Sequence, residues 1–133
     1  MQAEMMWIVN KSEVQYKFVE AYVRQLKQKI QEGNISITSR KKNTDFLRRL
    51  GWNYKALINF LYEHLCAEDY ISGPEDDYDM SEGSVWKFGK TIFEDNQYFE
   101  VYIKIKDEKI SIKCLSFHEA AHTLVYPLKE ETT

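Results

Sequence analysis

The segment VWKFGKTIFEDNQYFEVYIKIKDEKISIKCLSFHEAAHTLVYP, residues 85–127, decides the fold. Residues 98–106 and 109–117 are its strongest strand candidates, because β-branched and aromatic residues alternate there with polar ones. Residues 85–88 and 91–93 are shorter strand candidates. The second half of the chain is therefore expected to form a small antiparallel β-sheet.

A turn at Asp107-Glu108 is expected to join the two longer strands; since neither residue is Gly, a longer turn is the alternative. The two-residue turn sets a register in which Ile103 lies opposite Ile112. One face of the hairpin is then apolar and packs on the helices. The other face carries four polar side chains: Tyr102, Lys104, Ser111 and Lys113.

The first half of the chain is predicted to be helical. Residues 12–30 carry an apolar residue at every fourth position, which indicates an amphipathic helix. Ser12 and Gln15 form a candidate capping box, and Gly33 is expected to follow the last turn. The apolar stripe consists of Val14, Phe18, Tyr22, Leu26 and Ile30.

Two shorter helices are expected next. One begins after Asn43 or Thr44 and ends at Gly51. Asn53 can cap the other, which should stop near Cys66.

The remaining segments connect these elements. Residues 35–38 predict a short strand or an extended linker, and residues 68–83 predict a long acidic loop broken by Ser-Gly-Pro. Helices followed by antiparallel strands indicate an α+β domain of two layers, with N-terminal helices packed on a small antiparallel sheet. A chain of 133 residues is enough for a single domain.

Composition limits the classes of function. No apolar run approaches the roughly 20 residues of a membrane span, and no signal peptide is recognisable, so a cytoplasmic protein without a membrane partner is expected. Cys66 and Cys114 are expected to be free thiols. The net charge of −3 is unusual for a non-specific nucleic-acid binder, which is commonly basic. No cofactor is expected.

Two stretches of the sequence partly match metal-site patterns. His118 and His122 match the H-E-x-x-H spacing of zinc proteases, but that motif requires a helix, whereas a strand leads into His118 and Pro127 follows closely. The acidic residues 75–82 lack the ligand spacing of an EF-hand. A solvated loop is the preferred interpretation, and no metal site is predicted.

The polar hairpin face offers a different chemistry. Metal-independent RNA cleavage needs a proton acceptor, a proton donor and cations on the phosphate. His118 can act as acid or base, and Tyr102 can donate a proton or position the substrate. Spacing alone favours the other interpretation, a solvent-exposed sheet surface without catalytic function. The candidate phosphate-binding cations are Lys87, Lys104 and Lys113.

The position of His118 depends on the path of its strand. Strict alternation places it on the same side as Ile112 and Cys114, which is the buried side. It joins the lysine face only if the strand ends, twists or bulges near Ser116.

Several pieces of the chain together resemble a known family. They are KNTDFLRRLG (42–51), EDYISGPE (68–75), VWKFGK (85–90), VYIKI (101–105) and CLSFHE (114–119). In this order and spacing they resemble the MqsR-like toxins of type II toxin–antitoxin systems, which belong to the RelE-like ribonuclease fold. The likeness is greatest to variants from Gram-positive bacteria and mobile elements. It covers a core of residues 41–127 and leaves residues 1–40 as an N-terminal helical extension.

The resemblance implies an mRNA interferase, a metal-independent endoribonuclease that is inhibited by a cognate antitoxin protein. Tyr102 and Lys104 match the tyrosine and lysine of the family's V-Y-[LI]-K-I strand. Lys87 and His118 fall where the best-known branch has Gln and Lys, respectively. These four residues are the expected catalytic set. The expected phosphate- or RNA-binding residues are Lys113 and Lys90.

A non-catalytic binding module on the same fold is the rival function. A phage or mobile-element protein could use an acidic surface to occupy the nucleic-acid groove of a host protein. The acidic stretch and the net charge of −3 favour this rival. The run Arg40-Lys41-Lys42 indicates a solvated cap, with an acidic partner or nucleic acid as the alternative.

Overall fold

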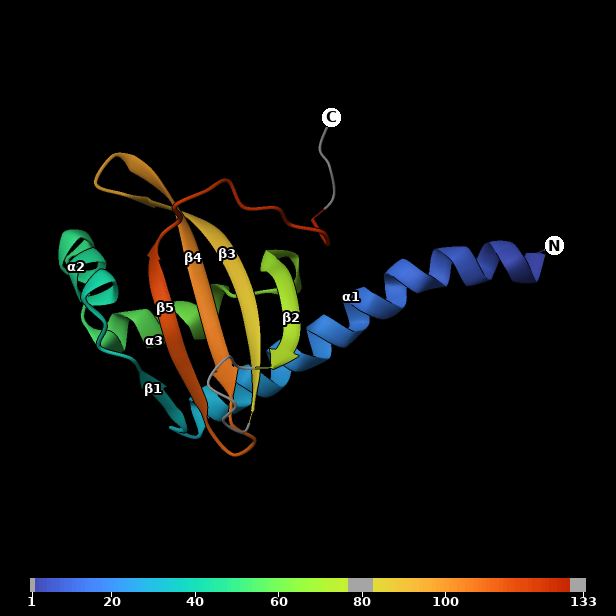
Figure 1. Ribbon diagram of the computed structural model, residues 1–133, viewed down its shortest axis with the longest axis horizontal. Coiled ribbons are helices and arrows are strands. Elements are labelled where there is room, and N and C mark those ends of the chain that lie inside the picture. The colour runs from blue at the N-terminus through green and yellow to red at the C-terminus, as the bar shows by residue number, and fades with distance from the viewer. Residues whose placement is uncertain (1, 77–82, 130–133) are drawn as a thin grey trace.

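A mixed sheet of five strands, in the order β1-β5-β4-β3-β2, forms one layer of the molecule (Figure 1). The computed structural model describes residues 2–76 and 83–129, with side chains from residue 13 onward. Its helices are α1 (Gln2–Gln31), α2 (Lys41–Leu50), α3 (Tyr54–His64) and the short 3-10 helix η1 (Ala67–Asp69). Its strands are β1 (Ile35–Ile37), β2 (Tyr70–Asp76), β3 (Ser84–Glu94), β4 (Gln97–Asp107) and β5 (Ile112–Glu119).

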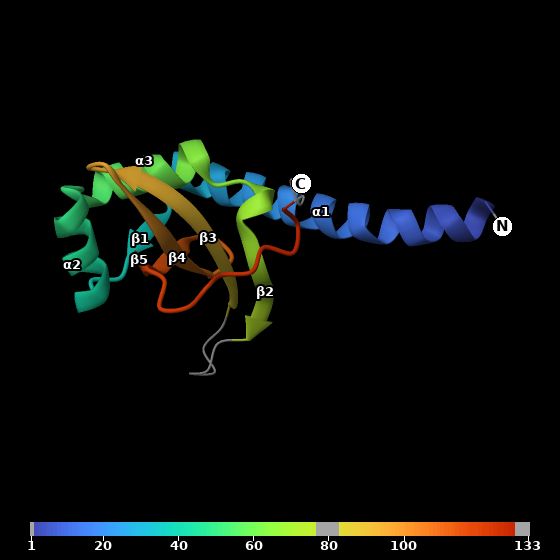
Figure 2. The same cartoon turned by 90° about the horizontal axis from the view of Figure 1, so that it is seen from above.

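The chain folds as an α+β domain, as predicted. Helices α1 and α3 cover one face of the sheet, which we call the helix face (Figure 2). We call the opposite side the open face. Among the described residues, only the C-terminal segment, residues 120–129, crosses it (Figure 2). The sheet is not wholly antiparallel, because β1 runs parallel to β5. The turn after α1 brings β1 onto the outer edge of β5, where it satisfies backbone groups that would otherwise be exposed.

The core lies between the helix face and α1 and α3. Tyr22 of α1 stacks on Trp86 of β3 with ring centroids 3.8 Å apart. The fully buried side chains at the centre of this layer include Val19, Leu26, Leu57, Leu61, Phe88, Ile103 and Phe117.

Helix α1 differs from its prediction at the N-terminal end. It begins at Gln2 and runs through Ser12, so the expected capping box does not start it. Val14 and Phe18 are 64% and 56% exposed. The N-terminal part of α1 extends past the sheet (Figure 1).

The helix ends agree better with the sequence. At the end of α1, Gly33 has a φ of 80°, and Asn34 N donates to Lys29 O at 2.8 Å. Gly51 ends α2 with a φ of 75°. The side-chain oxygen of Asn53 accepts from Ala56 N at 2.8 Å and starts α3 as predicted. Helix α2, however, begins at Lys41, so its start was predicted too late.

The prediction of a loop over residues 68–83 is wrong in its first half, where η1 and β2 form. Strand β2 is an edge strand with two register shifts, which accommodates Pro74 because an edge needs no N–H from that residue. Residues 77–82, including most of the acidic stretch weighed as a calcium site, lie outside the described residues.

The sheet strands are longer than predicted. The two short candidates merge into β3, which turns into β4 at Asp95 and Asn96, both with positive φ as in a type I′ hairpin. The turn between β4 and β5 spans residues 108–111, and Lys109 adopts a φ of 74°. The predicted register is therefore wrong: Ile103 lies opposite Phe117 and not opposite Ile112.

Candidate nucleic-acid interface

A bulge in β5 determines where His118 lies. Ile105 pairs with Cys114 while Lys104 pairs with Ser116, so Leu115 is an extra residue in β5. One inserted residue reverses the side to which later side chains point. Phe117 is therefore fully buried on the helix face, and His118 lies opposite Tyr102 on the open face. A bulge near Ser116 was one of the three conditions under which His118 could join the lysine face, and it is present.

Asn43 of α2 holds the bulged segment. Its amide nitrogen donates to Leu115 O at 3.0 Å and to Thr38 O at 2.9 Å. Its amide oxygen accepts from Phe117 N at 3.0 Å. Asn43 is completely buried. Strand β1 pairs with β5 only as far as Cys114, and the Asn43 amide binds the β5 backbone beyond that point. A residue of α2 thus fixes the strand that carries His118.

His118 and Tyr102 form the centre of the open face. Their ring centroids are 5.7 Å apart with an interplanar angle of 49°. His118 Nδ1 lies 3.0 Å from Glu119 O. A carbonyl oxygen only accepts, so this contact is a hydrogen bond in the tautomer that carries its proton on Nδ1, and that tautomer leaves Nε2 as an acceptor.

The Tyr102 hydroxyl keeps its proton at neutral pH. Burial raises its pKa above the ordinary value, the charge of Lys87 opposes this shift, and the charge of Glu75 adds to it. A protonated phenol beside an imidazole is suited to donate a hydrogen bond or a proton.

Two lysines extend this centre along the sheet. Lys87, Lys104 and Ser116 are paired across β3, β4 and β5, next to the row that contains Tyr102 and His118. The ammonium group of Lys87 lies 2.9 Å from a carboxylate oxygen of Glu75. In the described part of the chain, Lys104 makes no ion pair and so offers the stronger attraction for a phosphate.

Lys113 and Lys90 are less available to bind phosphate or RNA than expected. Lys113 lies opposite Lys106, farther along the same face, with Nζ 3.9 Å from a carboxylate oxygen of Glu108. Lys90 pairs with Val101 on the helix face, and its Nζ binds the buried carboxylate of Asp69 at 2.9 Å. The structure thus places Lys90 on the wrong side of the sheet for the predicted role, where it neutralises a buried charge.

The C-terminal segment crosses the open face (Figure 2). Leu124 N donates to a carboxylate oxygen of Glu100 at 3.1 Å. A Cβ atom at Gly89 would meet a side-chain carbon of Leu124 at 2.5 Å and the Tyr126 hydroxyl at 2.8 Å, so a larger residue there would require these side chains to shift. Burial raises the pKa of Tyr126 to about 12, and its hydroxyl has no hydrogen-bond partner within the described residues.

The basic residues of α2 lie beside His118, which sequence reasoning did not anticipate. A hollow of ≈ 270 Å³ lies where α2 meets the end of β5. Its lining residues are Lys42, Asp45, Phe46, Arg49, His118 and Glu119. Arg49 binds Glu119 at 3.1 Å and lies 4.8 Å from the centroid of the Phe99 ring. Helical spacing of Lys42 and Arg49 was visible in the sequence, but the contact of α2 with β5 was not.

The H-E-x-x-H spacing does not form the zinc-protease arrangement. β5 ends at Glu119, and His122 lies in an irregular segment. Over residues 2–76 and 83–129, no three His, Cys, Asp or Glu side chains are grouped so that they could hold a metal ion. None of the helices described combines the length and apolarity that a membrane span requires.

Comparison with protein-family models, with curated proteins and with solved structures finds no match to this chain.

Proposed function

We propose that the protein is an endoribonuclease toxin of a type II toxin–antitoxin system, with a RelE-like fold, that cleaves mRNA without a metal ion. The observation that carries the proposal is the Leu115 bulge, which brings His118 next to Tyr102 on the open face. Lys104 follows in the adjacent row. An acid–base pair and an available cation are the groups that phosphodiester cleavage requires.

The reaction is an internal transfer of the phosphate. A base removes the proton of the ribose 2′-hydroxyl, the 2′-oxygen forms a bond to phosphorus, and the bond from phosphorus to the 5′-oxygen breaks. The leaving 5′-oxygen takes up a proton, so the products carry a 2′,3′-cyclic phosphate and a 5′-hydroxyl. His118 Nε2 is the proposed base and Tyr102 the proposed donor to the leaving group. Lys104, together with Lys87, stabilises the charge that develops on the phosphate.

The basic side of α2 supplies the phosphate contacts that the overall charge of −3 does not predict. Lys42 and Arg49 line the hollow that contains His118, so phosphates on either side of the cut bond can lie near them. Because such contacts release counterions, RNA binding should weaken steeply as salt rises.

The proposed partner, besides RNA, is a cognate antitoxin protein that silences the toxin in the cytoplasm. Support comes from the family resemblance of residues 41–127 and from the polar open face, on which the proposed catalytic residues lie partly exposed. An adjacent gene that encodes a short DNA-binding protein would support an antitoxin partner, provided that the encoded protein co-purifies with this chain.

Induced expression in a bacterial host tests the enzyme proposal. We expect wild-type protein to arrest growth and fragment transcripts, and His118→Ala to do neither. His122→Ala is the matched control, because His122 is exposed and lies outside the sheet, and it should be as toxic as wild type. If the wild type and His118→Ala are equally harmless and no transcript is cut, the proposal is wrong.

One observation favours the rival, a binding module that blocks a host nucleic-acid-binding protein. Glu75 lies 2.9 Å from Lys87 and so reduces the positive charge of the open face. Glu75 and Asp76 are exposed at the end of β2. Capture of a large basic nucleic-acid enzyme from host lysate, without RNA cleavage, would support the rival; capture of a small DNA-binding antitoxin would support the toxin.

A further inference from the structure

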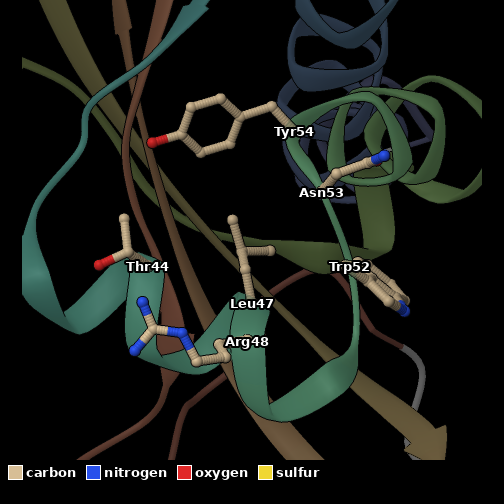
Figure 3. A pocket seen from close by; sticks show the side chains of 6 residues that line it. All are labelled: Thr44, Leu47, Arg48, Trp52, Asn53 and Tyr54. Atoms are coloured by element: carbon tan, nitrogen blue, oxygen red, sulfur yellow. The ribbon is translucent and has the colours of Figure 1, made fainter.

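A second hollow, of ≈ 400 Å³, lies between α2 and α3 (Figure 3). Its lining residues are Thr44, Leu47, Arg48, Trp52, Asn53 and Tyr54. Figure 3 shows the ring of Tyr54 and the guanidinium group of Arg48 extending from the two helices toward Thr44, beside Leu47. The hollow therefore combines an aromatic ring, a cation and an apolar side chain, and its size is that of a small-molecule site.

This hollow and the one beside His118 lie on opposite flanks of α2. With 3.6 residues per turn, Lys42, Phe46 and Arg49 face one flank, whereas Leu47 faces the other. Between the flanks runs an exposed ridge that carries Lys41, Asp45 and Arg48. A helix is about 10–12 Å across, so a short single strand lying over the ridge reaches both hollows.

We propose that the hollow between α2 and α3 binds a base of the single-stranded RNA whose phosphate lies at His118. This inference rests on the proposed function and names how that site selects its substrate. Unpaired bases are recognised by stacking on aromatic rings and on Arg, with hydrogen bonds to their edges. Tyr54 is 39% exposed and offers its ring for stacking, and Arg48 offers donors for a base edge or a phosphate.

The charge of α2 favours nucleic acid as the occupant of this surface. Its exposed cations, with the residue that precedes the helix, are Arg40, Lys41, Lys42, Arg48 and Arg49. Asp45 is the single acidic residue of α2, and it is shared between Lys41 at 2.7 Å and Arg48 at 3.7 Å. The ridge keeps an excess of positive charge along the path between the two hollows, which suits a phosphate backbone.

Binding of a labelled, single-stranded RNA of mixed sequence tests the proposal. All variants are made in a His118→Ala background, so that the RNA stays intact, and anisotropy is measured at one fixed salt concentration. Tyr54→Ala should weaken binding about tenfold, as the loss of one stacked base predicts. Tyr62→Ala is the matched control, because Tyr62 lies on the same helix and is 40% exposed, and its effect should stay below about twofold.

Two further probes distinguish binding of a base from binding of a phosphate, and loss of stacking from loss of folding. Tyr54→Phe keeps the ring and should bind RNA within about threefold of the parent. An abasic strand of the same length should bind the parent and Tyr54→Ala equally. Equal losses from Tyr54→Ala and Tyr62→Ala, or an equal loss on the abasic strand, would overturn the proposal. Since no variant in this test needs to cleave RNA, a lack of cleavage by the wild type would refute the nuclease proposal alone.

Discussion

The two faces of the sheet differ most clearly at two consecutive residues. Phe117 is fully buried against Phe46, Trp52 and Phe60. His118 lies partly exposed across from Tyr102. Only the inserted Leu115 makes the side chains of this segment point as they do, because without it their sides would be exchanged. A one-residue irregularity thus separates the residue that holds the fold from the residue proposed to act on RNA.

Substitution of these two neighbours should give the largest contrast in stability. Phe117→Ala removes a buried aromatic ring and should lower the free energy of unfolding by about 3–5 kcal/mol. His118→Ala removes a partly exposed ring and should change it by less than about 0.5 kcal/mol. Urea unfolding followed by circular dichroism measures both. Similar losses in the two variants would mean that the faces are not divided as described.

Asn43→Ala should have the next largest effect, because it leaves the buried N–H of Phe117 and the carbonyl of Leu115 without their partner. We expect a loss of about 1–3 kcal/mol in the free energy of unfolding. Hydrogen exchange at the Phe117 amide should become faster in the same variant. Thr44→Ala, at the partly exposed neighbouring position, is the control, and a comparable loss there would exclude a special role for the Asn43 amide.

Tyr102→Phe should affect RNA cleavage on the open face without affecting the stability of the fold. It removes a hydroxyl that can donate to the leaving oxygen and should lower the RNA cleavage rate about tenfold, which corresponds to about 1.4 kcal/mol. The free energy of unfolding should not fall, because the Tyr102 hydroxyl makes no hydrogen bond to another described residue. An unchanged cleavage rate would remove Tyr102 from the mechanism.

The smallest expected effect concerns the segment that crosses the open face. The pKa of Tyr126 is raised from 10.0 to about 12, so the fold keeps the phenol protonated at a pH where the unfolded chain releases the proton. This contribution to stability is complete below about pH 10 and is lost as the pH rises toward about 12. Wild type should therefore lose more stability than Tyr126→Phe between about pH 9 and about pH 11. Identical pH dependence in urea unfolding would contradict the buried position of the phenol.

Much of the local structure was predictable because it depends on residues close in sequence. Gly33 and Gly51 end helices with a positive φ that glycine adopts readily, and Asn53 caps the helix that follows it. The identities of Tyr102, Lys104 and His118 as candidates also came from the sequence. These signals need no knowledge of the tertiary fold.

The features that complete the site were not predictable, because they depend on contacts between distant residues. Asn43 fixes the β5 bulge across 74 positions of sequence. The placement of Lys42 and Arg49 beside His118 requires the docking of α2 on β5. Lys90 was expected to bind phosphate or RNA, but it lies on the helix face, where its Nζ binds Asp69, 21 positions away in a segment predicted to be a loop.

Cleavage of RNA by the purified protein tests the central claim most directly. RNA is incubated with wild type and with His118→Ala in the presence of a chelator, and the product ends are analysed. We predict fragments with 2′,3′-cyclic phosphate and 5′-hydroxyl ends from the wild type, and a rate lower by about 10²–10⁴-fold for His118→Ala. Intact RNA after incubation with a folded wild-type protein, or equal cleavage by the two proteins, would contradict the account.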